Sequence, residues 1–305
     1  MARTVHTFCR YCLAACGVDV TVEGGRVVKI SADKQNPHSW RDFCAKGRTA
    51  HQVVEHPRRL LAPMKRVGDR YVEAGWDEAI SDIAARLNAA IEEGGPDAVG
   101  AYYGNPAGYS STNLMFMNGW LDAVGTHNRY AVGSVDQNAL HVVAEKMYGS
   151  SLMVPVSDVD NCDYFVLVGA NPAVSAWNWL ESVPGGWRRT LARQQQGATV
   201  VVVDPVRTET AERADIHVAV RPGQDWALLL AMVTIILDEG LYHRGDCADL
   251  ATGVDRLRGL TADVDLADLA RRCDVPLAVI TDVARDFATA ERAMLVTRTG
   301  VSLHL

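Results

Sequence analysis

Cys9-Arg10-Tyr11-Cys12-Leu13-Ala14-Ala15-Cys16, followed by Cys44 in the run 43–47, is the stretch that decides how this chain begins to fold. Two residues separate the first pair of cysteines and three the second, so tight turns can aim three thiols at one centre that Cys44 completes. Iron–sulfur clusters are held by four thiolates in this way. A structural zinc also takes four cysteines, usually from two Cys-x-x-Cys hooks, and this chain has one. Four unrelated buried thiols are a third interpretation, which the grouping of three cysteines within eight residues disfavours.

Length and composition set broad limits on the protein class. At 305 residues the chain exceeds one ordinary core, so we expect two or more compact units. A hydrophobic content of 48%, with 22% charged residues, is typical of a globular protein. The net charge of -7, without a long basic run, makes nucleic acid an unexpected partner.

Targeting and redox compartment follow from the apolar runs and the remaining cysteines. The longest apolar run, 227–237, is too short to cross a bilayer, so we expect a buried helix and no membrane span. No export signal is visible before Cys9, which predicts a cytoplasmic location. Cys162, Cys247 and Cys273 are scattered, and seven cysteines is an odd count, which predicts reduced thiols rather than a disulfide framework.

Alternating patterns predict the first elements. Residues 18–30 alternate apolar and polar side chains around Gly24-Gly25, which predicts a β-hairpin that returns the chain towards Cys44. A helix is expected from Asp77, an N-cap candidate, to a stop at 94–96, followed by a strand at 98–103 and a helix at 112–124.

The fold class predicted for the later part is α/β, with a doubly wound parallel sheet. Apolar runs at 164–168, 198–203 and 216–220 alternate with helical segments, as buried parallel strands do. Ligands of such sheets bind outside the carboxyl ends of the strands. Small or acidic residues follow these strands: Gly169, Asn171, Asp204, Gly223 and Asp225. No Gly-x-Gly-x-x-Gly follows a predicted strand, which argues against a nicotinamide dinucleotide.

Taken together, the motifs resemble one family. The cysteine triplet, the fourth cysteine and Lys46-Gly47 are similar to the molybdenum or tungsten bis-pterin oxidoreductases, the group of dimethyl sulfoxide reductase, formate dehydrogenase and bacterial nitrate reductases. The likeness continues in order through segments 169–172, 204–211, 214–215 and 221–225. Taken singly, Asn171-Pro172 and Asp204-Pro205 are also explained as turns that end strands.

The resemblance implies cofactors and roles for individual residues. It implies a 4Fe-4S cluster and a molybdenum (or tungsten) bis-molybdopterin guanine dinucleotide, with Lys46 relaying electrons between them. The implied cluster ligands are Cys9, Cys12, Cys16 and Cys44. The residues implied to hold the guanine nucleotide are Gly169, Asn171, Asp204, Arg207, Thr208, Gly223 and Asp225.

The protein ligand to the catalytic metal is left open. By resemblance it should come from residues 127–137, where no cysteine occurs. Ser134 or Asp136 could ligate through oxygen, or Ala131 could fill the ligand position and leave the metal without a protein ligand. The structural alternative is a turn at Gly133-Ser134 with Asp136 as the N-cap of a helix over 138–147. Arg129 could steer an anionic substrate, although a salt-bridged arginine is the more common situation.

The domain expectation combines pattern and resemblance. We expect a 4Fe-4S cluster domain at 1–60, the first segment of an αβ pterin-binding domain at 61–130 and a Rossmann-like nucleotide-binding domain at 131–290. Residues 291–305 are expected to return to the second domain and to be cut short there. The resemblance covers an N-terminal part of the catalytic subunit, so the chain alone is not expected to enclose two pterins.

The predicted function is two-electron redox or oxygen-atom transfer on a small substrate such as formate, nitrate or a sulfur or arsenic oxyanion. Electrons would leave through the cluster to a redox partner protein or subunit. An alternative is a noncatalytic iron–sulfur electron-transfer or assembly subunit derived from the family. A zinc-binding interaction module is a third possibility.

Overall fold

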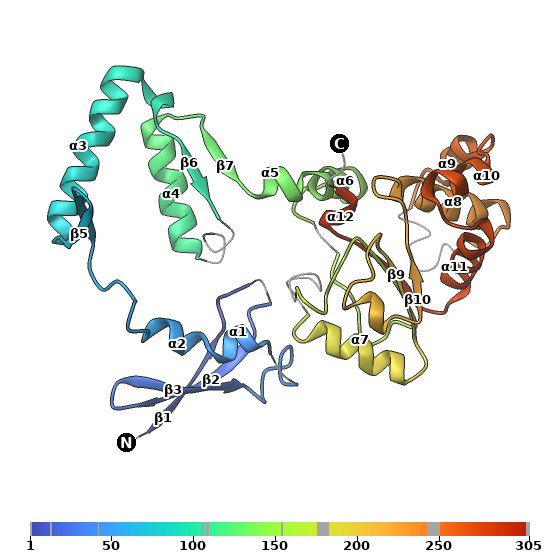
Figure 1. Ribbon diagram of the computed structural model, residues 1–305, viewed down its shortest axis with the longest axis horizontal. Coiled ribbons are helices and arrows are strands. Elements are labelled where there is room, and N and C mark those ends of the chain that lie inside the picture. The colour runs from blue at the N-terminus through green and yellow to red at the C-terminus, as the bar shows by residue number, and fades with distance from the viewer. Residues whose placement is uncertain are drawn as a thin grey trace. The chain divides into compact units, whose positions relative to one another are not determined.

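The computed structural model describes residues 2–12, 14–41, 43–104, 107, 110–153, 155–175, 183–242 and 251–302, without the side chains of residues 134 and 135. The chain forms two compact units, Met1–Asn138 and Ala139–Leu305. Figure 1 shows their helices and strands in order along the chain.

The first unit begins with a small antiparallel sheet. Its order is β1-β2-β3, with β1 Arg3–Phe8, β2 Gly17–Glu23 and β3 Arg26–Ala32. The predicted hairpin is confirmed, because β2 and β3 pair and the turn residues Gly24 and Gly25 have φ values of 56° and 81°. Two positive φ values at a two-residue turn match the twist of the flanking strands. The prediction missed β1, which pairs with β2 from Arg3 to Phe8.

The rest of the first unit consists of short strands and two longer helices. The elements after β3 are α1 Ala45–Arg48, α2 Ala50–Val54, β4 Met64–Val67, β5 Arg70–Glu73, α3 Trp76–Gly94, the 3-10 helix η1 Pro96–Ala98, β6 Ala101–Tyr103, α4 Ser111–Val124, β7 Arg129–Ala131 and α5 Gly133–Asp136. β6 and β7 are parallel neighbours. Helix α3 has Gly75 as its N-cap, so Asp77, the predicted N-cap, lies within the first turn. Its apolar stripe is exposed, with Trp76 at 68%, Ile80 at 60% and Ile83 at 57%.

The second unit is built on a four-stranded parallel sheet. The strands are β8 Tyr164–Val168, β9 Thr199–Val203, β10 Ile216–Val218 and β11 Ala293–Thr297, in the order β10-β9-β8-β11. The helices are α6 Asn138–Tyr148, α7 Gly186–Gln195, η4 Ala211–Arg213, α8 Asp225–Asp238, α9 Val254–Thr261, α10 Leu266–Cys273, α11 Leu277–Thr289 and α12 Thr299–Ser302.

Alternate side chains of the central strands pack on opposite faces of this sheet. Val166 and Val201 belong to the core that includes helices α8, α10 and α11, whereas Phe165 and Val200 belong to the core against which Trp187 of α7 packs. Figure 1 shows α7 apart from the α8–α11 group in this unit. Every residue of β8 is buried. The doubly wound α/β prediction is therefore confirmed.

The last strand differs from its prediction. Residues 291–305 were expected to return to the segment 61–130, but β11 pairs in parallel with β8 along its whole length. A local pattern of apolar residues predicts a strand, but it does not indicate with which other strand it pairs. Along the chain, helix α11 precedes β11 and follows the other three strands. A helical connection of this kind adds a parallel strand to the same sheet.

Candidate iron–sulfur centre and cofactor-binding edge

The cysteine triplet forms a closed loop between β1 and β2. The N–H of Cys9 donates to the carbonyl oxygen of Cys16 at 2.8 Å, and the N–H of Ala15 donates to that of Cys12 at 3.2 Å. Ala15 has a positive φ of 41°, which marks the tight turn inside the loop. Pairing of β1 with β2 thus fixes the first and third cysteines beside each other.

Cys44 reaches the same place from the other side of the hairpin. It precedes helix α1 as the N-cap residue. Cys9, Cys12 and Cys16 share a small apolar cluster with Ala14, Val18 and Phe43. Gly47 lies against this cluster, because a Cβ placed on it would be 3.2 Å from the Cys9 sulfur and 2.7 Å from the Phe43 ring.

The surroundings of Cys9 and Cys16 oppose their ionisation to thiolates unless a cation is bound. Burial, followed by the neighbouring thiols of Cys12, Cys9 and Cys44, raises the pKa of Cys16 to about 12. Burial also raises the pKa of Cys9, and Cys44 adds to that shift. A bound metal reverses this preference, since a coordinating thiol is deprotonated.

The spacing of the sulfurs separates the two metal hypotheses. A tetrahedral zinc with Zn–S bonds of about 2.3 Å places its sulfurs roughly 3.8 Å apart. Among the described residues, the one three-ligand group whose donor atoms lie within 4.8 Å of one another consists of His6, Asp19 and Asp33, with no cysteine. No three of the described cysteine sulfurs lie this close to one another, which fits a multi-iron cluster better than a single ion.

A buried serine ties the Cys16 segment to the loop that leads to Cys44. Ser39 is 1% exposed, and its Oγ accepts the N–H of Gly17 at 2.7 Å. Its hydroxyl donates to Oδ1 of Asn36 at 3.2 Å. A Cβ on Gly17 would be 2.4 Å from the Asn36 amide, so this position has no room for a side chain. These contacts could not be predicted from the spacing of the cysteines.

The predicted relay Lys46 lies in α1, two residues after Cys44, and is exposed. Its neighbour Arg48 donates from Nε to the carbonyl of Phe43 at 3.4 Å and stacks over the Phe43 ring at 5.4 Å. The arginine therefore covers the apolar pocket. The relay role of Lys46 stays a prediction.

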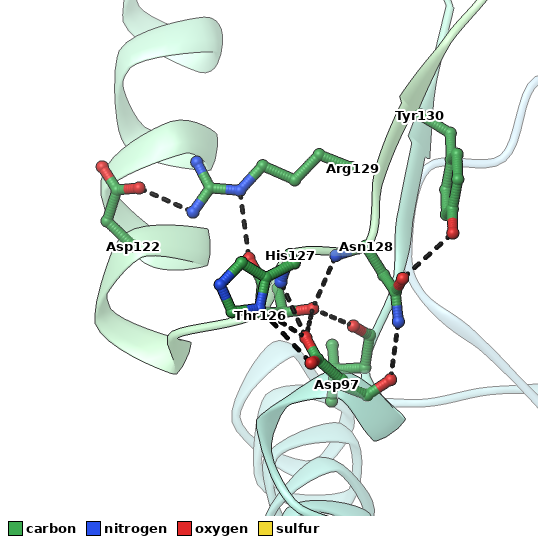
Figure 2. Close-up of polar contacts among 8 residues, drawn as sticks. Asp97, Asp122, Thr126, His127, Asn128, Arg129 and Tyr130 are labelled. Atoms are coloured by element: carbon green, nitrogen blue, oxygen red, sulfur yellow. Dashed lines mark hydrogen bonds and ion pairs between the residues drawn. The ribbon is translucent and has the colours of Figure 1, made fainter.

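A polar network fixes the strand that leads into the predicted metal-ligand loop (Figure 2). Thr126 is 2% exposed and donates to the carbonyl of Val99 at 2.6 Å. The carboxylate of Asp97 accepts the N–H of His127 at 2.8 Å, and its Oδ1 lies 3.2 Å from His127 Nδ1. Asn128 Nδ2 donates to the Asp97 carbonyl at 2.7 Å. The segment between α4 and β7 is thereby attached to the end of η1.

Arg129 belongs to this network as well. Its Nη2 is 2.6 Å from Oδ1 of Asp122, and its Nε donates to the carbonyl of Thr126 at 3.3 Å. The ion pair agrees with the structural alternative for this arginine. Steering of an anionic substrate by Arg129 stays a prediction.

Among the described side chains of this loop, Asp136 has an unused ligand atom. Asp136 is the last residue of α5, so it is not the N-cap of the next helix. Its Oδ1 is buried and has no hydrogen-bond partner among the described residues. Ala131 ends β7, and the side chain of Ser134 lies outside the described part. An orphaned buried carboxylate oxygen fits an oxygen ligand to a metal, since buried polar atoms are otherwise paired.

At the carboxyl edge of the parallel sheet, the loops after β8 and β9 are joined through Asn171. Its Nδ2 donates to Oε2 of Glu209 at 2.9 Å, and its Oδ1 accepts the hydroxyl of Thr210 at 2.7 Å. Thr210 is fully buried and also accepts the N–H of Ala173. The Asn171 amide, followed by the N–H of Glu209 itself, lowers the pKa of the Glu209 carboxyl. Glu209 and Thr210 were not among the predicted site residues.

The other predicted nucleotide-binding residues occupy the same edge. Oδ1 of Asp204 accepts the N–H of Val206 at 2.9 Å, and Oγ1 of Thr208 accepts that of Ala211 at 3.3 Å. Arg207 is exposed, Gly169 and Gly223 have φ values of 60° and 79°, and Asp225 is buried at the start of α8. The parallel sheet thus collects these residues at one edge, and their contacts with a nucleotide stay predictions.

The remaining cysteines support the expectation of ordinary thiols. Cys162 is buried and its pKa is raised to about 11 by burial, and burial likewise raises the pKa of Cys273. Cys247 lies outside the described residues.

Comparison with known proteins identifies the family. Residues 59–297 match the family described as Molybdopterin oxidoreductase, and residues 2–56 match the Molybdopterin oxidoreductase Fe4S4 domain. The chain therefore belongs to the molybdopterin oxidoreductases, as the motifs predicted. Membership implies a 4Fe-4S cluster and a molybdenum or tungsten bis-molybdopterin guanine dinucleotide as cofactors.

Individual relatives agree with this assignment. The chain is 33% identical over 290 residues to a nitrate reductase of Symbiobacterium thermophilum, which covers 92% of the chain and 37% of that protein. It is 26% identical over 301 residues to the alpha subunit of an F420-dependent formate dehydrogenase of Methanocaldococcus jannaschii. The matched region covers 98% of this chain and 43% of that protein. The chain thus spans about two fifths of the length of these relatives.

The fold is shared with a solved structure. Acetylene hydratase from Pelobacter acetylenicus superimposes with a TM-score of 0.77 at 23% identity, over 97% of this chain and 40% of that one. In the part of the chain that the structure describes, no helix has the length and apolar character that a bilayer crossing requires.

Gly47 provides a test of the cluster pocket. Gly47→Ala places a methyl group against the buried Phe43 ring and the Cys9 sulfur, and such overpacking costs about 1–3 kcal/mol. We expect the variant to be purified with less iron per chain and to release it faster to a chelator. Gly119→Ala is the matched control, because a Cβ in that helical position meets open space. Equal iron retention in both variants would contradict the packing described here.

Asp97 provides a pH test of the network in Figure 2. The N–H and then the ring of His127 lower the pKa of Asp97, so its stabilisation is present above the unfolded pKa of about 3.9 and is lost as the pH falls through the lower folded value. We expect Asp97→Asn to lower the thermal midpoint at pH 7, with a difference from the wild type that shrinks below about pH 4. A difference independent of pH between 7 and 3 would show that the charge of Asp97 has no role.

Proposed function

We propose that this chain is part of the catalytic subunit of an iron–sulfur molybdopterin oxidoreductase that performs two-electron redox or oxygen-atom transfer on a small substrate. The observation that carries the proposal is that Cys9, Cys12 and Cys16 share one apolar cluster and that Cys44 is close enough to raise the pKa values of Cys9 and Cys16. A cluster held there would pass single electrons, and burial with hydrogen bonding near the sulfurs would set its potential. Lys46, beside this pocket, would relay electrons to the pterin.

The doubly wound unit would hold the guanine nucleotide at its carboxyl edge. Asp204 and Asp225 would accept hydrogen bonds from the ribose or the guanine, and Gly169, whose backbone packs against Gly300, would shape the start of the loop. Asn171 would act by holding the Glu209 carboxylate and Thr210 in place, since both ends of its amide are already bonded. When bound, the cofactor supplies a metal that exchanges two electrons with the substrate.

For the metal ligand we favour Asp136. The support is its orphaned buried Oδ1, which Ala131 cannot match. Ligation by Ser134, or a metal without a protein ligand, are the alternatives. A hard carboxylate oxygen in place of a cysteine distinguishes this site from the cysteine or selenocysteine type of the family.

Substrate, partner and location are proposals of the same kind. The relatives named above are a formate dehydrogenase subunit and a nitrate reductase, so formate and nitrate are the first substrates to test, followed by sulfur and arsenic oxyanions. A redox partner protein or subunit would take up or supply the electrons. We propose a cytoplasmic location, which the free buried thiols Cys162 and Cys273 support, since reducing compartments maintain free thiols.

The cluster is tested by removing one ligand. Cys12→Ser in the full-length gene product should abolish the brown colour and most of the iron, because a hydroxyl replaces one thiolate of the quartet. Iron, molybdenum, tungsten and pterin are measured in the anaerobically purified protein, with Cys273→Ser as the matched control. Intact iron in Cys12→Ser refutes the ligand assignment. Iron without pterin or metal in the wild type would favour the noncatalytic electron-transfer subunit.

The metal ligand has a separate test. Asp136→Asn weakens an oxygen ligand while conserving shape, so X-ray absorption at the metal edge should lose one oxygen scatterer, with the cluster unchanged. Ser134→Ala, two residues earlier in α5, is the comparison and should leave the spectrum as it is. The opposite result, with Ser134→Ala changing the spectrum and Asp136→Asn not, identifies the serine instead.

A further inference from the structure

Arg298 lies at the carboxyl edge of the parallel sheet, where the nucleotide is expected. It follows the last residue of β11, and its N–H donates to the carbonyl oxygen of Val168 at 3.1 Å. Val168 ends β8, so Arg298 lies beside Gly169, the first residue of the loop that contains Asn171. Neither the sequence motifs nor the resemblance pointed to this arginine.

The guanidinium of Arg298 has a buried donor that the described chain does not use. Its Nε is buried and has no hydrogen-bond partner among the described residues. An unpaired buried polar group is unfavourable, and native proteins usually pair such groups with protein, water or ligand. Arg292, at the opposite end of β11, shows the ordinary arrangement: its Nε donates to Oδ2 of Asp163 at 3.2 Å. The Nε of Arg298 therefore has no acceptor in the described part of the chain, and the backbone of Arg298 lies at the edge of the sheet where a ligand is expected.

Two glycines bring the loop after β8 into backbone contact with helix α12, Thr299–Ser302. A Cβ on Gly169 would be 2.9 Å from the Cα of Gly300, and a Cβ on Gly300 would be 2.8 Å from the Cα of Gly169. The loop after β8 and helix α12 thus pack backbone against backbone, which requires glycine at both positions. This contact fixes the backbone on either side of Arg298.

The guanidinium of Arg298 favours a phosphate as the missing acceptor, whereas the acids at this edge suit other groups of a nucleotide. Asp204, Glu209 and Asp225 are acids suited to the donor groups of a ribose or a guanine, and they would repel a phosphate. An arginine offers a planar set of N–H donors that matches phosphate oxygens in pairs. A dinucleotide has both kinds of group, so one ligand can satisfy both kinds of residue.

We propose that Arg298 binds a phosphoryl oxygen of the diphosphate in the guanine dinucleotide cofactor, beside the contact of Gly169 with Gly300. The proposal rests on the proposed function, because it names a further binding residue of the same cofactor. It assigns the phosphate to the junction of β11 and α12, and the base and ribose to the loops that carry the acids.

The test compares GDP with guanosine, which lacks the diphosphate, on the cofactor-free 305-residue chain. Binding is measured by calorimetry for the wild type, Arg298→Gln and the matched control Arg292→Gln, which alters an arginine at the other end of the same strand. We expect the wild type to prefer GDP. Arg298→Gln should weaken GDP binding by about 10- to 100-fold, the effect of losing a hydrogen bond to a charged group, and leave guanosine binding unchanged. Arg292→Gln should retain the preference for GDP.

Folding is monitored in parallel. Because Arg298→Gln removes an unpaired buried donor, the ligand-free variant should unfold at or above the thermal midpoint of the wild type. If Arg298→Gln fails to fold, Arg298→Lys provides the test, since it keeps the charge and loses the planar donor set; it should also weaken GDP and spare guanosine. Unchanged GDP affinity in whichever variant folds overturns the proposal.

Two further outcomes separate the failures. If inorganic phosphate binds the wild type as tightly as GDP does, Arg298 belongs to a plain anion site and the dinucleotide assignment is overturned. If the wild type binds neither GDP nor guanosine and the full-length protein contains no pterin, the proposed function itself fails, and this inference fails with it. GDP binding that is indifferent to Arg298 overturns the inference alone.

Discussion

The first unit depends on one constraint, which is that Cys9, Cys12 and Cys16 lie together in an apolar cluster with Cys44 close by. The hydrogen bond from the N–H of Cys9 to the carbonyl of Cys16 closes the loop, and Ser39 holds the next peptide. Burial raises the pKa of Cys16 to about 12, so thiolates are unfavourable there without a cation. Iron in a cluster would provide that positive charge, and the β2–β3 hairpin lies between Cys16 and Cys44 in the chain.

The second unit gathers its polar groups at the carboxyl ends of a parallel sheet. Its central strands are buried on both faces, so polar side chains that could bind a ligand lie in the loops at the ends of the strands. Because all four strands are parallel, their following loops gather at one edge, where Asn171 links two of them through Glu209 and Thr210. A hydratase shares this fold, so the fold alone does not set the reaction. The residues that face the cofactor and the metal must set it instead.

The sequence allowed much of the fold to be predicted, because its signals are local. A hairpin was predicted from the Gly24-Gly25 turn, and buried strands from the apolar runs at 164–168 and 198–203. The spacing of the cysteines predicted a metal-binding loop. Strand β1 was missed since its residues are exposed and lack a clear pattern, and the neighbour of β11 was mistaken because pairing is a long-range property.

For the candidate site, residue types were predictable and contacts were not. The sequence indicated Asn171 and Arg129, yet only the structure shows that the first braces two loops and that the second pairs with Asp122. Ser39 and Arg298 had no signal in the sequence, because a buried hydroxyl and an unpaired guanidinium nitrogen become recognisable only when their surroundings are known.

The central claim is that the four thiols bind a 4Fe-4S cluster. Mössbauer spectroscopy of protein produced anaerobically with isotopically enriched iron, combined with metal analysis, measures this directly. The account predicts about four iron atoms per chain in one spin-coupled cluster with cysteine ligation. A single zinc ion per chain, or iron in mononuclear sites, would contradict it.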